Sequence, residues 1–525
     1  MRSNGVSEFK DLDQAEAFGR LQGIPAPELE AVLSGDRVST CSLPAGGGLT
    51  YNYGAKAVSD DAVAVLADLA AEQELVAKYK ALASGEVMNT GEDRMVLHHL
   101  MRGVVADKVV KDGFDYRAAY VAEQRRVAEF AEAVRAGRIV GSTGKRFETF
   151  VQIGIGGSDL GPRAMYLAIE GAYDHLPARF ISNVDPDDAA AVLQDLDPES
   201  TLFVLVSKSG TTQETLTNEA FVIDHMERSG RGVKARKHIV AVTSKTSPLA
   251  ESADYLDAFF IDDYIGGRYS STSAVGGVIL SLAFGPEIFA EFLDGAHEAD
   301  VAAMEPEITK NAPMLDAAIG VYERNVLGYP VTAVLPYSQA LSRFPAHLQQ
   351  LDMESNGKSV NRAGGKLRYH TGPVVFGEPG TNGQHSFYQL LHQGTDVIPV
   401  QFIGFKESQR NHDLEWGGST SQTKLNANLA AQIIAFSTGK HADNPNKRFA
   451  GGRPSSLIHG DRLTARTLGA LLAHFENKVM FQGFLWNLNS FDQEGVQLGK
   501  VLAKQILSGD AASPAMAAYA RLLGL

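Results

Sequence analysis

Short apolar runs alternate with amphipathic stretches through most of the chain after residue 146, and this alternation constrains the fold more than any other feature. The runs are rich in Val, Ile and Phe, as buried strands are, and cover residues 147–155, 178–184, 201–206, 237–243 and 259–262. Stretches with helical periodicity separate most of them, at residues 160–173, 186–193 and 212–228. Because strands joined through helices pair in parallel, the pattern predicts a parallel sheet with helices on both faces.

A second region repeats this texture further along the chain. Its predicted strands are residues 330–335, 373–376 and 396–402, and its predicted helices are residues 339–351, 384–392 and 422–436. The flanking regions are mainly helical in pattern, and 525 residues are too many for one hydrophobic core. We therefore predict an α/β fold with two doubly wound, mainly parallel domains. The expected boundaries are a helical N-terminal region at 1–110, α/β domains at 111–290 and 320–505, and a helical tail at 506–525.

Charge and cysteine content narrow the class of partner. A formal net charge of −14 argues against binding nucleic acid or an anionic membrane, but a single pocket in an acidic protein is able to hold a small anion. Cys41 is the only cysteine, and the N-terminal segment lacks the apolar core of a signal peptide. The longest apolar stretch, residues 274–284, is too short to cross a bilayer. These features predict a cytoplasmic protein.

A glycine-rich loop at residues 154–162 follows the first predicted strand and contains Gly157 and Ser158. Glycines at the start of a helix let the backbone approach an anionic ligand. A dinucleotide fingerprint does not fit, because its third glycine would fall at Asp159. A ligand loop and a tight structural turn both remain open.

A hydroxyl-rich loop follows a later strand and favours a phosphate. It runs from Ser207 to Thr215, and its first part reads Ser-Lys-Ser-Gly-Thr-Thr. Hydroxyls and free N–H groups at the carboxyl end of a parallel strand suit a phosphate oxygen. The alternative, an ordinary helix cap, needs one hydroxyl, whereas this loop offers four before Gln213.

Four further motifs each present one ionisable side chain. Arg268 follows two glycines, Glu354 precedes Ser-Asn-Gly-Lys, His385 lies in a turn-rich segment, and Lys500 ends an Asp-Gln-x₆-Lys sequence. Taken singly, a turn arginine, a loop glutamate, one histidine of 14 and a solvated lysine are ordinary surface residues. Glu354 is the exception in one respect, because a carboxylate at the end of a helix opposes the helix dipole.

Together and in this order, the loops around Gly154, Ser207, Gly266, Glu354, His385 and Lys500 resemble the glucose-6-phosphate isomerase family. The likeness spans roughly residues 110–505, and the two α/β regions look like that family's paired sugar-isomerase (SIS) domains. The most specific pieces are Ile-Gly-Gly-Arg-Tyr-Ser at 265–270, Asp-Met-Glu-Ser-Asn-Gly-Lys at 352–358 and the segment 491–500. Two departures concern specificity: Ser209-Gly210 replaces the usual Thr-Phe, and Glu494 and Gln497 replace Trp and Glu.

The resemblance implies reversible isomerisation of glucose 6-phosphate to fructose 6-phosphate through a cis-enediol, in a homodimer. It implies that Glu354 is the base, that Arg268 steadies the enediolate and that Lys500 lies near the ring oxygen. His385 would assist ring opening from the neighbouring subunit, with Glu214 as its carboxylate partner. The implied substrate-binding residues are Gly157, Ser158, Ser207, Lys208, Ser209, Thr211, Thr212, Gln350 and Gln493.

No cofactor or metal is expected for this chemistry. The adjacent His98 and His99 point in different directions on a helix, and no H-E-x-x-H or cysteine cluster occurs. Two alternatives remain: a broader isomerase of mannose or amino-sugar phosphates, and a non-catalytic sugar-phosphate sensor. The sensor would have no use for Glu354, His385 and Lys500 together.

Overall fold

The first sheet of the protein is parallel and is built from five strands. The computed structural model describes residues 8–510 and 513–525. The sheet has the order β11-β10-β9-β7-β8, with every neighbouring pair parallel. Its strands are β7 (Thr149–Ile153), β8 (Ala178–Ile181), β9 (Thr201–Val206), β10 (Ile239–Thr243) and β11 (Asp257–Phe260). Numbered along the chain, this is the doubly wound order 2-1-3-4-5, which reverses direction between β7 and β9.

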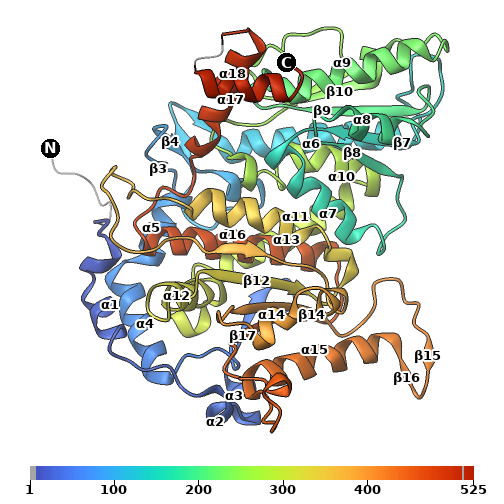
Figure 1. Cartoon of the computed structure of the whole chain (residues 1–525). Coiled ribbons are helices and arrows are strands. Elements are labelled where there is room, and N and C mark those ends of the chain that lie inside the picture. The colour runs from blue at the N-terminus through green and yellow to red at the C-terminus, as the bar shows by residue number, and fades with distance from the viewer. Residues whose placement is uncertain (1–7, 511–512) are drawn as a thin grey trace, which may run out of the picture.

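Helices cover both faces of this sheet because its strands are apolar on both sides (Figure 1). Val151 and Phe203 pack with α8 (Pro186–Leu193) and α9 (Gln213–Arg228) in one cluster. Phe150, on the opposite side of β7, belongs to the main core. The helices of that core on this side are α6 (Tyr116–Arg135), α7 (Leu160–Ile169) and α10 (Ala274–Phe284).

The second sheet repeats the order of the first and then extends it. Its order is β1-β2-β17-β14-β12-β13, where β13, β12, β14 and β17 are parallel. These four strands are β12 (Val331–Pro336), β13 (Val374–Phe376), β14 (Val400–Phe405) and β17 (Ser455–Gly460). The helices of this half are α13 (Phe344–Leu348), α14 (Tyr388–Gln393) and α15 (Ser421–Thr438). The predicted fold class, two mainly parallel α/β units with helical flanks, is confirmed.

The N-terminal region contains short hairpins that the helical pattern of its sequence did not predict. Strands β1 (Ser42–Gly46) and β2 (Leu49–Asn52) form a hairpin that joins the edge of the second sheet, with β2 antiparallel to β17. The hairpin therefore ties the start of the chain to a strand some 400 residues later, which no local pattern reveals. The helices of this region are α1 (Glu16–Leu21), α2 (Leu29–Val32), α3 (Gly35–Thr40), α4 (Asp60–Glu72) and α5 (Leu75–Ala83).

One helix forms the centre of the molecule between the two sheets. Every residue of α16 (Ala465–Leu485) except Arg466 is buried. Its buried charged residues have buried partners, since His474 and Lys478 contact Asp316 and Glu476 contacts Arg102. The helix packs against α11 (Pro286–Ala302) and α12 (Ala312–Asn325), which connect the two α/β units. Both units and the connection are thus joined in one continuous core.

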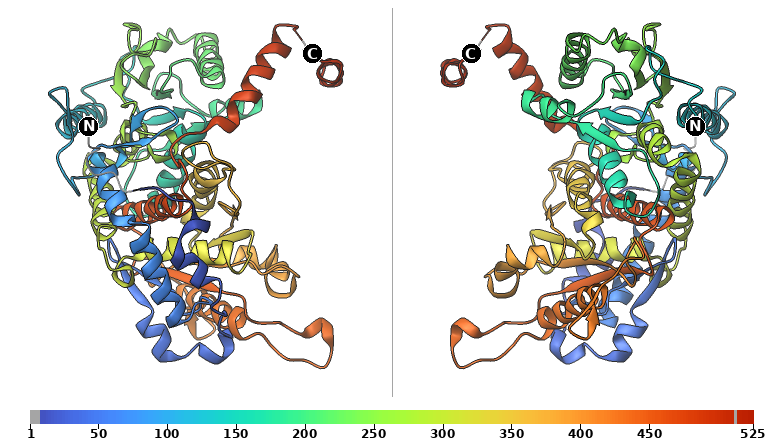
Figure 2. Two further views of the ribbon diagram at one scale, coloured as in Figure 1. Left: turned by 90° about the vertical axis from the view of Figure 1, so that its left-hand side faces the viewer. Right: turned by 90° about the vertical axis from the view of Figure 1, so that its right-hand side faces the viewer.

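Two segments project from the body toward the same side, as Figure 2 shows. One is the hairpin of β15 (Glu415–Trp416) and β16 (Ser419–Thr420), and the other contains α17 (Gln497–Leu507) and α18 (Pro514–Leu522). Neither α17 nor α18 has a buried residue among those described. Among the described residues, no helix is both long and apolar enough to span a membrane.

Candidate active site

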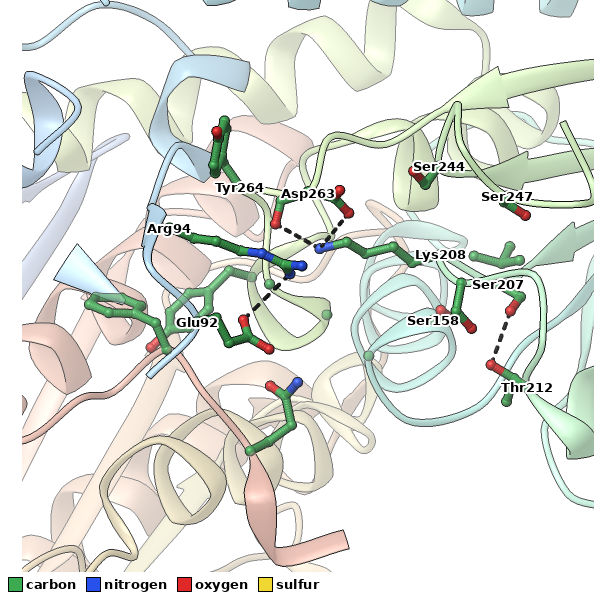
Figure 3. Close-up of a pocket in the computed structure, with 18 of the residues that line it drawn as sticks. Glu92, Arg94, Ser158, Ser207, Lys208, Thr212, Ser244, Ser247, Asp263 and Tyr264 are labelled. Atoms are coloured by element: carbon green, nitrogen blue, oxygen red, sulfur yellow. Dashed lines mark hydrogen bonds and ion pairs between the residues drawn. The ribbon is translucent and has the colours of Figure 1, made fainter. Parts of the chain in front are cut away.

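A polar cavity of about 520 Å³ opens at the carboxyl ends of the strands of the first sheet (Figure 3). The loops after β7, β9 and β10 form one side of it, and the loop that follows β11 and the segment Phe491–Gln493 form another. This is the point between β7 and β9 where the strand order reverses, and loops diverge there to leave a crevice. The sheet therefore places the predicted glycine-rich and hydroxyl-rich loops side by side.

The hydroxyl-rich loop presents hydrogen-bond donors to this cavity. Ser207, Lys208, Ser209 and Thr212 line it. Thr212 is the N-cap residue of α9, yet its hydroxyl makes no capping bond and instead lies 3.0 Å from the Ser207 hydroxyl. The capping alternative thus fails for Thr212, and the first turn of α9 keeps free N–H groups near the cavity. Thr211 is exposed and bonds to Ser209.

The glycine-rich loop is held against the arginine loop by direct backbone contact. A Cβ atom on Gly157 would collide with the backbone of Gly267, so only glycine allows the two turns to touch. Gly156 has a φ of +60°, and a Cβ there would lie 3.3 Å from the side-chain nitrogen of Gln350. These contacts bring Ser158 and Gly267 to the same cavity wall.

Arg268 is buried, with 1% of its side chain exposed, and links both α/β units. Its Nη1 lies 3.2 Å from Glu354 Oε2 and 2.9 Å from Gln493 Oε1. Its Nε donates to the Ser355 hydroxyl at 2.6 Å, and Nη2 donates to two backbone carbonyls of the C-terminal segment. Because all three of its nitrogens donate hydrogen bonds within the protein, the Arg268 guanidinium is held in one position.

The Glu354 motif and the C-terminal motif meet because their polar residues bond to one another. Lys358 donates to the carbonyls of Ser355 and Asn489, both at 2.7 Å, and its ammonium lies 3.0 Å from Asp492 Oδ1. Glu354 itself ends a π-helical turn, Gln349–Glu354, which continues α13. Such wide turns are rare and recur at functional sites. The Glu354 side chain remains partly exposed, at 24%.

Gln350, in the same turn, reaches the glycine-rich loop, and its carbonyl oxygen is buried without a hydrogen-bond partner in the described part of the chain. The turn therefore supplies two side chains to the region between the units. Neither Glu354 nor Arg268 lines the cavity of Figure 3 directly, but Gln493 does and is bonded to Arg268. The Arg268–Glu354 pair lies immediately behind the cavity wall.

Three predicted residues are not brought into this cluster. His385 is exposed in a short helical segment, Asn382–His385, after β13. Lys500 is exposed on the projecting α17. Glu214, in the first turn of α9, is half-buried, and within residues 8–510 and 513–525 no hydrogen bond or ion pair connects it to His385.

The cavity also contains residues that sequence reasoning missed. Ser244, Thr246 and Ser247 follow β10 at the same sheet edge, so the rule that ligands bind beyond strand ends would have found them. Glu92 and Arg94 come from the N-terminal region, where the hairpin of β3 (Val87–Asn89) and β4 (Arg94–Met95) closes the cavity. No local motif marks them. Among the described residues, no group of three His, Cys, Asp or Glu side chains is placed to hold a metal ion.

Comparison with known proteins gives a consistent result. The model of the family described as phosphoglucose isomerase matches residues 52–521. The chain is 58% identical over 526 residues to a glucose-6-phosphate isomerase of Treponema denticola, covering 98% of this chain and 100% of that protein. It is 46% identical over 511 residues to the enzyme of the same name from Borreliella afzelii, covering 96% of each. A crystal structure of a glucose-6-phosphate isomerase from Chlamydia trachomatis superposes with a TM-score of 0.91 at 45% identity, over 98% of this chain and 99% of that one.

Proposed function

The chain belongs to the phosphoglucose isomerase family and interconverts glucose 6-phosphate and fructose 6-phosphate, and we propose that Glu354 is the base that moves the proton between C1 and C2. Isomerisation requires removal of a proton next to the carbonyl and its return to the adjacent carbon. One carboxylate beside both carbons is able to perform both steps. The observation that carries the proposal is the Arg268–Glu354–Gln493 cluster, with contacts of 3.2 Å and 2.9 Å, directly behind the polar cavity.

Arg268 stabilises the enediolate that forms when Glu354 takes the proton. Negative charge develops on the substrate oxygens only at that stage, so a fixed guanidinium contributes more to the transition state than to the bound substrate. Five hydrogen bonds hold Arg268 in place before any substrate binds. No reorganisation is then needed during the reaction.

The hydroxyl-rich loop binds the 6-phosphate and so fixes the non-reacting end of the sugar. The groups that we assign to this role are Ser207, Lys208, Ser209, Thr211 and Thr212, with Gly157 and Ser158 from the neighbouring turn. Anchoring one end restricts where C1 and C2 lie, and this orientation is worth several kcal/mol of the barrier. Gln350 and Gln493 face the sugar carbons from the side of Glu354.

We assign ring opening to His385 of the partner subunit, in a homodimer. Two observations support a dimer: His385 lies outside the cavity of its own chain, and both projections expose large apolar side chains. Trp416 is 76% exposed on the β15–β16 hairpin, and Leu498 and Leu522 on α17 and α18 are 68% and 80% exposed. Surfaces of this kind are usually covered by a partner. Glu214 serves as the carboxylate that orients the incoming histidine.

Lys500 reaches the ring oxygen when α17 folds against the cavity. It follows the cavity residue Gln493 by only seven residues, and Gln497–Leu507 has no buried side chain to hold it in its projecting position. Dimer formation or substrate binding would supply the missing contacts. The reaction needs no cofactor, because each proton transfer is assigned to a side chain.

We further infer a cytoplasmic location, which the lone Cys41 supports because it is unable to form an intramolecular disulfide. We also propose the boundaries 111–290 and 320–505 for the two SIS-type units. The first range contains all five strands of the first sheet, and the second contains the four parallel strands of the second sheet, whose β1 and β2 come from the N-terminal region.

A coupled assay tests the function directly. Purified protein is supplied with fructose 6-phosphate, and formation of glucose 6-phosphate is followed with a dehydrogenase. We expect turnover in the ordinary range of about 1–10³ per second. Mannose 6-phosphate and glucosamine 6-phosphate serve as comparison substrates, and comparable turnover of either would show a broader isomerase. No turnover of fructose 6-phosphate would overturn the assignment.

A further inference from the structure

The wall of the cavity that faces the hydroxyl-rich loop carries a second cation, Arg94, on the β3–β4 hairpin. Figure 3 shows Arg94 and Lys208 extending toward one another from opposite walls, with Glu92 and Asp263 beside them. The side chain of Arg94 is 37% exposed, and that of Glu92 is 33% exposed. Both therefore remain accessible to a ligand in the cavity.

The donors of these two cations are used very differently. Lys208 donates to the backbone carbonyls of Asp263 and Ile265 at 2.8 and 3.0 Å, so the protein uses two of its three ammonium donors and one stays available for a ligand. The Arg94 side chain makes one long contact, from Nη1 to Glu92 Oε2 at 3.5 Å, and no other hydrogen bond in the described part of the chain. A guanidinium has five N–H donors in a planar fork that matches phosphate oxygens. Arg94 thus keeps most of its donors free.

The hairpin that presents Arg94 is tied to the catalytic cluster rather than loosely placed. Asn89 donates to Glu92 at 2.8 Å and accepts a hydrogen bond from Asn489 at 2.9 Å. Asn489 in turn donates to Asp492, whose backbone carbonyl accepts from Arg268. On the other side, the backbone N–H of Leu97 donates to the carbonyl of Tyr264 at 2.9 Å. The hairpin is therefore fixed from both sides of the cavity.

Two cationic side chains, Arg94 and Lys208, face each other across the cavity. Burial lowers the pKa of the Lys208 ammonium and the Arg94 guanidinium lowers it further, while the carboxylates of Asp263, Glu92 and Asp262 oppose the shift. Each cation has a carboxylate beside it, but neither contact is a short hydrogen bond: Arg94 Nη1 lies 3.5 Å from Glu92 Oε2, and Lys208 Nζ lies 3.9 Å from Asp263 Oδ1. A phosphate carries about two negative charges at neutral pH and is attracted by both cations.

We propose that Arg94 binds the phosphate of the substrate, as the cation that closes the phosphate subsite opposite the loop from Ser207 to Thr212. This role rests on the proposed function of that loop. When the substrate binds, Arg94 exchanges its long contact with Glu92 for hydrogen bonds to phosphate oxygens. Glu92 is the counter-charge of Arg94 in the free enzyme. The N-terminal region thereby takes part in specificity for phosphorylated sugars.

The test measures binding of inorganic phosphate to the whole enzyme by calorimetry, together with steady-state kinetics on fructose 6-phosphate. Arg94→Ala should weaken phosphate binding and raise KM roughly 10- to 100-fold, with kcat within about threefold of the wild type. Arg94→Lys keeps the positive charge but lacks the planar set of N–H donors, so its KM and its phosphate affinity should lie between those of the wild type and of Arg94→Ala. Glu92→Gln should act in the opposite direction and tighten phosphate binding by about threefold, because Arg94 loses its competitor.

The matched control is Arg228→Ala, which removes one positive charge from α9 at a side chain that is 80% exposed and away from the cavity. The proposal is overturned if Arg94→Ala binds phosphate within twofold of this control, or if it lowers kcat and leaves phosphate affinity unchanged. If Arg94→Ala folds poorly, the phosphate affinity of Glu92→Gln tests the proposal independently. A weaker phosphate affinity in Glu92→Gln than in the wild type also contradicts the proposal. Wild-type turnover is measured first, since its absence would overturn the proposed function and not the role of Arg94.

Discussion

The two α/β units share a strand order but offer different chemistry at equivalent places. In the first unit the loops after β7 and β9 line the cavity with hydroxyl and N–H groups. In the second unit, the segment after β12 continues through α13 into the π-helical turn that carries Gln350 and Glu354. Both sets lie beyond the carboxyl ends of parallel strands, as ligand sites do in such sheets. The first unit is suited to holding an anion and the second to moving a proton.

Arg268 is the residue that joins these two tasks. It follows the last strand of the first unit and makes its side-chain contacts with Glu354, Ser355 and the C-terminal segment. On the roles proposed above, the duplicated fold is divided into a binding half and a catalytic half, with the buried Arg268 between them. This division predicts that substitutions in the two halves affect different kinetic constants.

The largest effect is expected in the catalytic half. Glu354→Gln keeps the shape and the hydrogen-bonding capacity toward Arg268 but removes the base. We expect kcat to fall by about 10³-fold or more, with KM for fructose 6-phosphate within about threefold of the wild type. Steady-state kinetics measure both constants. A rise in KM as large as the fall in kcat would show that Glu354 contributes to substrate binding as well as to catalysis.

Arg268→Met removes the cation that joins the halves. Loss of a fixed charge at the developing enediolate should lower kcat by roughly 10²- to 10³-fold. The guanidinium also satisfies two backbone carbonyls and the Ser355 hydroxyl, so the variant should lose stability in thermal unfolding. Arg268→Lys is the control for charge alone, and full activity in that variant would contradict the need for a planar, multiply bonded group.

A mixing experiment tests whether the catalytic half is completed by a second subunit. His385→Ala and Glu354→Gln chains are each expected to be nearly inactive, and they are unfolded together and refolded. In a hybrid dimer one of the two sites has an intact Glu354 and an intact His385 from the partner. Random assortment should restore about a quarter of wild-type activity. If His385 acts in its own chain, every hybrid site carries a lesion and no activity returns.

Substitutions in the binding half should produce smaller changes in the other constant. Ser207→Ala combined with Thr212→Val removes two hydroxyls of the hydroxyl-rich loop that lie 3.0 Å apart. We expect KM to rise about tenfold and kcat to change by less than about threefold. Inhibition by inorganic phosphate should weaken by the same factor as KM. A selective loss of kcat would place these hydroxyls in the chemical step.

The smallest effect on turnover is expected at Asp352, a buried carboxyl in the π-helical turn. Burial raises its pKa to about 7. Because the folded state then binds more protons than the unfolded state between about pH 4 and 7, this group lowers stability as pH rises through that range. Asp352→Asn should stabilise the protein at pH 8 by on the order of 2 kcal/mol and lose this advantage near pH 4. Denaturant unfolding at the two pH values measures it, and an equal effect at both would contradict the assigned cause.

The sequence predicted the first unit well because its strands are continuous apolar runs bounded by clear breaks. The predicted strand 201–206 and helix 186–193 coincide with β9 and α8. The second unit was harder: β17 was not among the predicted strands, and β2 joins it from the N-terminal region. Pairing over such distances leaves no local periodicity.

The same contrast applies to the candidate site. The loop that begins at Ser207 was found because it directly follows an apolar run, whose end marks the end of a strand. The contact of Arg268 with Glu354 follows from no spacing, and only the resemblance to a known family suggested that the two belong together. Arg94 had neither signal, because a short hairpin with strands of three and two residues carries it to the cavity from a region predicted to be helical.

Deuterium exchange from solvent tests the central claim, that Glu354 moves the substrate proton while the first unit holds the phosphate. Fructose 6-phosphate is incubated with enzyme in D₂O, and the label at C2 of glucose 6-phosphate and C1 of fructose 6-phosphate is followed by NMR. We predict deuterium at both carbons with the wild type, and none with Glu354→Gln at a phosphate affinity unchanged within about twofold. Exchange at a wild-type rate in Glu354→Gln would contradict the account.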